Sequence, residues 1–300
     1  MSGEDVLIGL RLIQYAGACL FLGVPLFLLG AGRGMRAPRA RPAVIAAAAA
    51  TAGAALLALV AQTAVMAGSW TKALDGEALS MVALNTGLGL SMLVRAGAAL
   101  AVGLIAAAVR PARTRWGLAS LAGVVAAASF AWSGHAGTAE GAGALLHPVA
   151  DAAHAVAGAT WLGALACLAT IGGSRAAHDP ATPRAFAAFS TVGTGSVGVL
   201  AVTGAVNAVF LVGPERLGQL ATGLWGQLLL AKLALFVLML ALAASNRWRL
   251  TPALAAAQVS GDPGPALARL RRSVALELLA GLALLAVVAA LGVQPPPARL

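Results

Sequence analysis

Two histidines and an aspartate fall close together in the stretch LHPVADAAH, residues 146–154. If this stretch is helical, Asp151 and His154 lie three residues apart on one face, a spacing with which helices present two ligands to one metal ion. His147 lies on the same stripe, but it is about 10.5 Å from His154 along an ideal helix axis. Because a metal–nitrogen bond is only about 2 Å long, a straight helix keeps the two histidines from sharing one ion. The spacing therefore predicts a chelating pair, with His147 at a separate outer step unless the start of the helix is irregular.

A fourth candidate ligand, His135, lies in the preceding segment WSGHAG and could join either the pair or the outer step. These residues also have an ordinary interpretation. Histidines are common at membrane interfaces, and the helix dipole stabilises an aspartate such as Asp151 near a helix N-terminus without any metal. Ionisable groups within membrane segments are usually functional, however. The combination of His135, His147, Asp151 and His154 therefore favours a metal or proton site.

The ligand types narrow the choice of ion. Imidazole and carboxylate groups suit copper better than calcium or magnesium, which prefer shells of oxygen atoms, and they do not exclude zinc. Met66 and Met81 flank an expected outer loop that contains Trp70. Their thioethers are soft ligands suited to Cu(I), although a methionine in a membrane helix more often serves packing. From the residues alone we therefore expect an outward-facing transition-metal site, for which copper and zinc both remain open.

The elements that must position these residues are membrane-spanning helices. The chain has 300 residues, of which 60% are hydrophobic and only 10% are charged. Apolar runs of 20 or more residues recur along it, which is typical of polytopic membrane proteins. We expect an all-α bundle of about eight transmembrane helices, formed by residues 1–300 as a single transmembrane domain. The expected spans are about 6–30, 43–67, 80–109, 116–133, 148–172, 186–212, 222–245 and 274–293.

The distribution of basic residues orients this bundle. The formal net charge is +10, but the basic residues form short clusters between apolar runs, without the interleaved aromatics of a nucleic-acid-binding surface. Fourteen of the 20 Lys and Arg residues lie in connections on one side, against three on the other. The basic connections are 33–41, 110–115, 173–184 and 246–273. Cytoplasmic loops carry the excess of Lys and Arg, so we expect both termini and LHPVADAAH at the periplasmic face.

Three basic residues fall inside expected spans: Arg11, Arg95 and Lys232. A charge within the hydrocarbon region must snorkel, pair or line a polar cavity. Arg11 is close enough to the outer edge to snorkel. Arg95 and Lys232 lie deeper, where structural pairing and a place on a transport pathway are both open. Trp161 continues the stripe of Asp151 and His154 two turns deeper and is a further candidate pathway residue.

Several stretches resemble one known family. SGHAG, followed by LHPVADAAHAVAGATWLGAL, is similar to the core motif of the CopD family of copper-resistance and copper-uptake membrane proteins. In that family a GHA segment precedes a D-x-x-H helix start and a W-x-G-G turn. The stretches GQLLLAKLALFVLMLALAASNRWRLTPAL and RRSVALELLAGLALLAVVAALGVQPP are also similar to the family. The resemblance covers about residues 80–297.

The resemblance implies movement of copper across the bacterial inner membrane, usually inward from the periplasm. It places His135, Asp151 and His154 in the family's polar motif, Trp161 in its tryptophan position and Lys232 in its helix lysine. The chain reads WLGAL where the family has WLGG, a departure that we expect to affect packing only. Some relatives carry or bind a small periplasmic copper-binding CopC domain. No outer segment here is long enough for one, so a CopC-like chaperone would be a separate partner.

Two other functional classes remain open from the residues alone. A haem-dependent membrane oxidoreductase needs axial histidines on facing helices, whereas this chain gathers its histidines at one outer edge. A copper sensor or assembly factor would bind the metal without moving it. The sequence has no nucleotide-binding loop, so we expect neither ATP-driven export nor an enzyme.

Overall fold

The computed structural model describes residues 3–33, 37–133, 143–171, 174–213, 218, 220–221 and 223–295. Within these ranges the chain is helical and contains no β-strand, which confirms the expected all-α bundle. His135 lies outside the described residues.

The first half of the chain forms four long antiparallel elements and a short outer hairpin. The first element is interrupted by a π-helical turn, and the fourth ends in a 3-10 turn. The elements are α1 (Gly3–Ala18), η1 (Cys19–Gly23), α2 (Val24–Leu29), α3 (Ala40–Ala67), α4 (Trp70–Ala73), α5 (Gly76–Asn85), α6 (Gly87–Ala108), α7 (Ala112–Ala128) and η2 (Ser129–Trp132).

The second half also has four long elements. One of them continues through a π-helical turn into a further helix, so that a single rod of 37 residues runs from Leu224 to Ser260. At 1.5 Å per residue this rod is about 55 Å long and exceeds the roughly 30 Å hydrocarbon core. The elements are α8 (Gly143–Ala169), α9 (Ser174–His178), α10 (Ala181–Leu211), α11 (Leu224–Ser245), η5 (Asn246–Leu250), α12 (Thr251–Ser260) and α13 (Gly264–Leu291).

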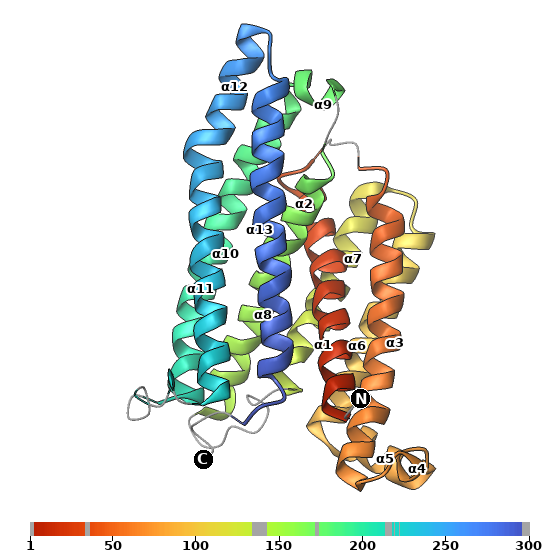
Figure 1. The fold of residues 1–300 in the computed structure, drawn as a ribbon. Helices are drawn as coiled ribbons and strands as arrows, with labels where there is room; N and C mark the ends of the chain where they lie inside the picture. The colour runs from red at the N-terminus through yellow and green to blue at the C-terminus, as the bar shows by residue number, and fades with distance from the viewer. Residues whose placement is uncertain are drawn as a thin grey trace.

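Seven of the described helices are long and apolar enough to cross a membrane. The span expected at 116–133 corresponds to α7 and η2, and α7 has only 17 residues. α7 nevertheless packs between α6 and α8 as part of the bundle. α1 begins, and α13 ends, toward the end of the bundle that carries α4 and α5, while α9 and α12 lie at the opposite end (Figure 1). The first and last long helices have their free ends at the same end of the bundle, which requires an even number of crossings. Eight crossings therefore remain the expected number.

The two halves meet along α8. α1, α3, α6 and α7 pack against one another, as do α8 with α10 and α11 with α13, and α8 also packs on η1, α2, α7 and α13. Where α8 crosses η1, a Cβ atom on Gly163 would lie 1.8 Å from the carbonyl oxygen of Cys19 and 2.7 Å from the Cα atom of Gly23. The helices therefore touch through their backbones, which only small residues allow.

Local sequence explains several helix ends. The side chain of Asp75 accepts a hydrogen bond from the backbone N–H of Ala78 at 3.1 Å and caps α5. The hydroxyl of Thr86 does the same for Gly89 at 2.9 Å and caps α6. α3 ends at Gly68, whose φ of 69° is the left-handed conformation that glycine adopts without strain.

Candidate metal-binding site

The stretch with Asp151 and His154 is helical, but its helix begins earlier than expected. α8 starts at Gly143, so His147 is a helical residue and Pro148 lies inside the helix. The expectation that the span begins at Pro148 is therefore wrong. A proline has a helical φ and removes only one backbone hydrogen bond near a helix end, so the helix can extend before it. His147, Asp151 and His154 thus share one helix, as the spacing argument requires.

The polar face of α8 is matched by a polar face on α10. Nδ1 of His154 lies 2.9 Å from the hydroxyl oxygen of Thr203. One turn nearer the outer end, Nδ2 of Asn207 donates a hydrogen bond to Oδ1 of Asp151 at 3.1 Å. Thr203 and Asn207 are four residues apart and therefore lie on one face of α10. Each candidate ligand on α8 is thus held by a neutral side chain from the facing helix.

The hydrogen bonds of Thr203 identify which nitrogen of His154 carries a proton. The Thr203 hydroxyl lies 2.6 Å from the backbone carbonyl oxygen of Val199, which can only accept a hydrogen bond. A threonine hydroxyl has one hydrogen. When that hydrogen is donated to Val199, the same oxygen accepts the N–H of Nδ1 from His154. The neutral imidazole then keeps its lone pair on Nε2, the arrangement in which a histidine binds a metal while its other nitrogen is held in place.

Lys232 on α11 brings a positive charge to this pair. It interacts electrostatically with both Asp151 and His154. Lys232 therefore lies near the polar side chains of α8 that face α10. Both predicted roles of Lys232, pairing with a charge or lining a pathway, refer to this place. Among Asp151, His154 and Lys232, the Asp151 carboxylate carries the negative charge that offsets the Lys232 ammonium group.

His147 occupies a different environment. Its ring is buried and stacks on the ring of Phe210 from α10, with centroids 4.8 Å apart and planes 7° apart. Within the part of the chain that the structure describes, no three His, Cys, Asp or Glu side chains come close enough to hold one metal ion. Asp151 and His154 therefore stay a predicted pair of ligands, and the place of His135 relative to them also stays a prediction.

Arg95 is held in the first half of the bundle, apart from this pair. It is only 2% exposed. Its guanidinium donates to Oε1 of Gln14 at 2.7 Å, to the hydroxyl of Ser133 at 2.7 Å and to the hydroxyl and carbonyl oxygens of Ser129 at 3.1 Å. It also lies over the ring of Phe130, 3.9 Å from the centroid. These contacts join α1, α6 and η2, which supports the structural interpretation of Arg95.

The other candidate pathway residues lie in three places. Trp161 is buried in the main hydrophobic core, with its ring edge-on to Phe236 of α11 at 6.0 Å. Met66 and Met81 are exposed, at the end of α3 and within α5. The sulfur of Met81 accepts a hydrogen bond from Asn85 at 3.5 Å.

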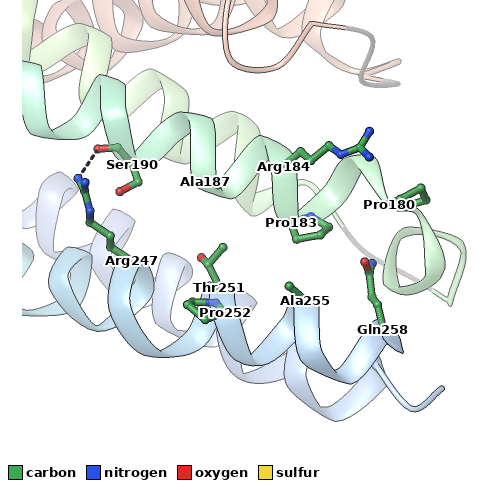
Figure 2. Close-up of a pocket in the computed structure, with 10 residues that line it drawn as sticks. All are labelled: Pro180, Pro183, Arg184, Ala187, Ser190, Arg247, Thr251, Pro252, Ala255 and Gln258. Atoms are coloured by element: carbon green, nitrogen blue, oxygen red, sulfur yellow. Dashed lines mark hydrogen bonds between the residues drawn. The ribbon is translucent and has the colours of Figure 1, made fainter. Parts of the chain in front are cut away.

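An open pocket of about 630 Å³ lies between α10 and the η5–α12 rod (Figure 2). It is lined by Arg184, Ser190, Arg247, Pro252 and Gln258, among others. Arg247 bonds to the backbone oxygen of Ser190 at 3.4 Å and to the hydroxyl of Thr194 at 2.6 Å. Two arginines and no carboxylate make this pocket unsuited to a metal cation.

The sequence did not identify Thr203 and Asn207 as the partners of His154 and Asp151. The sequence did contain a signal. Thr203 and Asn207 lie four residues apart in the outer half of one span, and Asp151 and His154 lie three residues apart in the outer half of another, so the two pairs have nearly the same spacing. Such a match becomes meaningful only once the two helices are known to be neighbours.

Comparisons with known proteins agree with this architecture. The family described as "Copper resistance protein D-like, N-terminal domain" matches residues 2–146, and the family described as "Copper resistance protein D" matches residues 183–291. The α8 residues His147, Asp151 and His154 lie between the two matched stretches.

Two curated proteins are similar to the chain. It is 34% identical to Copper resistance protein D of Pseudomonas syringae pv. tomato over 77% of its own length and 75% of that protein. It is 38% identical to Inner membrane protein YebZ of Escherichia coli (strain K12) over 40% of each chain. No solved structure matches it. With seven membrane-capable helices among its described residues, the chain therefore belongs to the copper resistance protein D family of multi-pass inner membrane proteins.

Proposed function

We propose that this protein moves copper ions across the bacterial inner membrane, from the periplasm to the cytoplasm, and thereby contributes to copper homeostasis and resistance. Asp151 and His154 form the outer binding pair for the ion. The observation that carries the proposal is the hydrogen bond between Nδ1 of His154 and Thr203, which leaves the Nε2 lone pair for a metal on the helix face that also carries Asp151.

In this proposal, the ammonium group of Lys232 and the copper ion take turns as the positive charge beside Asp151. An empty carboxylate inside a membrane needs a neighbouring positive charge, and the ammonium group of Lys232 supplies it to Asp151. A copper ion that binds Asp151 and His154 must compete with that ammonium group. Lys232 therefore weakens binding and favours release, as a transported ion requires, whereas a permanently bound metal would not.

The remaining features fit a carrier that faces the periplasm with both termini outward. The whole chain acts as one transmembrane domain and not as an enzyme. His147 lies one helical step outside the pair and Trp161 lies below it, and we assign His135 to the same outer step as a proposal. Exposed Met66 and Met81 are positioned in outer segments where their sulfur atoms could meet Cu(I). Copper is delivered by a separate CopC-like periplasmic chaperone.

Copper uptake into proteoliposomes, measured for both oxidation states of the ion, tests this function. We expect His154→Ala to reduce copper binding and uptake by at least about tenfold, because it removes a metal ligand. Lys232→Met should bind copper more tightly and release it more slowly. His178→Ala is the matched control, because His178 is exposed on the short helix α9.

Three outcomes would contradict the proposal. Uptake that is unchanged in His154→Ala would show that the pair does not carry the ion. Wild-type protein that binds copper but never moves it would favour a sensor or assembly factor. A purified protein with a Soret absorption band would indicate the haem-dependent alternative.

A further inference from the structure

A second polar cluster lies deeper in the bundle, on the side of the pair away from the periplasm. Glu277 stands near the middle of α13 and is 0% exposed. Asn246, at the junction of α11 and η5, is 7% exposed, and Trp161 on α8 is 2% exposed. Nδ2 of Asn246 donates a hydrogen bond to Oε2 of Glu277 at 2.8 Å. The indole of Trp161 lies beside the same carboxyl group.

Oδ1 of Asn246 has no hydrogen-bond partner among the described residues. Oε1 of Glu277 and Nε1 of Trp161 make no hydrogen bond of regular geometry there, but the indole N–H is a donor toward that carboxyl group. Buried polar atoms are nearly always paired in proteins, because an unpaired one has lost its hydrogen bonds to water and gained none in return. The unpaired amide oxygen and the loosely bonded carboxyl group therefore indicate a place that is hydrated or rearranged in another state of the protein.

The backbone beside the cluster is also unusual. Asn246 is the first residue of the π-helical turn Asn246–Leu250, where α11 passes into α12. π-helical turns are rare, and they occur most often at functional sites. The turn is an irregularity in an otherwise continuous rod, and it lies at the residue that binds Glu277. This observation is independent of the unpaired amide oxygen.

No charged side chain balances Glu277 among the described residues. The side chains that interact with it are Trp161 on α8 and Asn246 at η5, and neither of them titrates. The charged groups of the neighbouring elements interact elsewhere. Lys232 acts on Asp151 and His154, the guanidinium of Arg11 on α1 lies beside Gly292, and Arg247 binds Ser190 and Thr194.

The chemistry of the cluster selects its ligand. Copper prefers nitrogen and sulfur ligands, whereas this cluster offers carboxyl and amide oxygens together with an indole N–H. A hydrogen-bond donor that lies beside the carboxyl group also disfavours a bare metal cation. A carboxyl group without a counter-charge is most easily kept in a membrane interior as the neutral acid, so its natural ligand is a proton.

We propose that Glu277 is a proton-carrying site on the cytoplasmic side of the Asp151–His154 pair. The carboxylate takes up one proton to form the carboxylic acid while it is enclosed by Trp161 and Asn246, and it releases that proton when the cluster is opened to water. No electron transfer is involved. The existence of the proton site does not depend on which ion the protein moves. Only the coupling of the proton to copper rests on the proposed function.

The site itself can be tested without copper. The lipid-soluble reagent dicyclohexylcarbodiimide modifies protonated carboxyl groups within membranes, and mass spectrometry locates the modification. We expect the wild-type protein in lipid to be modified at Glu277 and not at Glu77, which is exposed on α5. A carboxylic-acid carbonyl band should be present in its infrared spectrum at neutral pH and absent from Glu277→Gln. An unmodified Glu277, or a band that Glu277→Gln retains, would overturn the proposal.

The coupling is tested in proteoliposomes with an imposed pH gradient. Glu277→Gln keeps the shape of the side chain, so it should bind copper as the wild type does but lose the response of copper uptake to the gradient. Glu77→Gln is the matched control and should keep that response. An undiminished response in Glu277→Gln would overturn the coupling. If the wild-type protein moves no copper at all, the proposed function is wrong. The dicyclohexylcarbodiimide modification and the infrared band then still show whether Glu277 is a proton site.

Discussion

At the scale of single residues, the candidate metal site depends on side chains that are not ligands. Nδ1 of His154 and the hydroxyl of Thr203 lie 2.9 Å apart, and Thr203 accepts the N–H of His154 in the tautomer in which its own hydrogen is directed to Val199. Asn207 uses its amide nitrogen to hold Asp151. Both contacts set the orientation of a ligand from the facing helix. The same division of labour is found around many metal sites, where outer partners fix the tautomer and ring orientation of the histidine.

Thr203→Val tests this role. Valine has nearly the same shape but no hydroxyl, so His154 loses the partner that holds Nδ1 and either nitrogen can then carry the proton. We expect copper affinity to fall about 10- to 100-fold, measured by competition with a copper chelator. Thr191→Val is the control, because Thr191 is exposed on the same helix. Equal affinities in the two variants would mean that Thr203 does not orient the ligand.

At the scale of the elements, α8 both carries the candidate ligands and joins the two halves of the bundle. Its crossing with η1 is a backbone contact at Gly163 and Gly23. Gly163 is the glycine of the WLGAL segment, in which the family's second glycine is replaced by Ala164. Ala164 is fully buried, so the bundle accommodates its side chain, and the effect of the departure on packing alone stays a prediction. The first glycine has no such freedom, because the neighbouring backbone occupies the space of a side chain.

Gly163→Ala should therefore destabilise the protein by about 1–3 kcal/mol, since the two helices must move apart to admit a methyl group. Gly158→Ala on the same helix is the matched control, because the nearest atom to its Cβ would be Cδ2 of Leu200 at 3.9 Å. Thermal unfolding in detergent should show a lower midpoint for Gly163→Ala than for Gly158→Ala. Midpoints that fall equally would mean that the crossing can relax.

At the scale of the whole molecule, the charge distribution and the fold describe one orientation. The end of the bundle with α9 and α12 carries the arginine-rich connections, and the end with α4 and α5 carries few basic residues (Figure 1). The Asp151–His154 pair lies on α8 toward the second of these ends. Because basic loops stay in the cytoplasm, the pair should be reached from the periplasm.

Labelling of introduced cysteines tests this orientation. The native Cys19 and Cys167 are buried, so they should give little background. Ser80 on α5 and Ser260 at the end of α12 are both exposed, at opposite ends of the bundle. A membrane-impermeant maleimide should label Ser80→Cys in intact spheroplasts and Ser260→Cys only after permeabilisation. The reverse pattern would place the pair at the cytoplasmic face.

The sequence alone determined the helical membrane class and the place of Asp151 and His154 on one helix, and it predicted the orientation. These properties follow from composition, from the side on which arginines accumulate and from the 3.6-residue period of a single helix. All of them are local or additive along the chain. For the same reason the sequence predicts that His147 is too far from His154 to share an ion, because the distance between them runs along a single helix.

The tertiary structure decided which polar residues meet across helices. Thr203 belongs with His154, Asn246 with Glu277, and Gln14 with Arg95, although the last pair lies 81 residues apart in the chain. The start of α8 at Gly143 was likewise visible only in the fold. The physical reason is that such contacts depend on the rotation and tilt of each helix relative to its neighbours. Packing of the whole bundle sets those angles, and no single span encodes them.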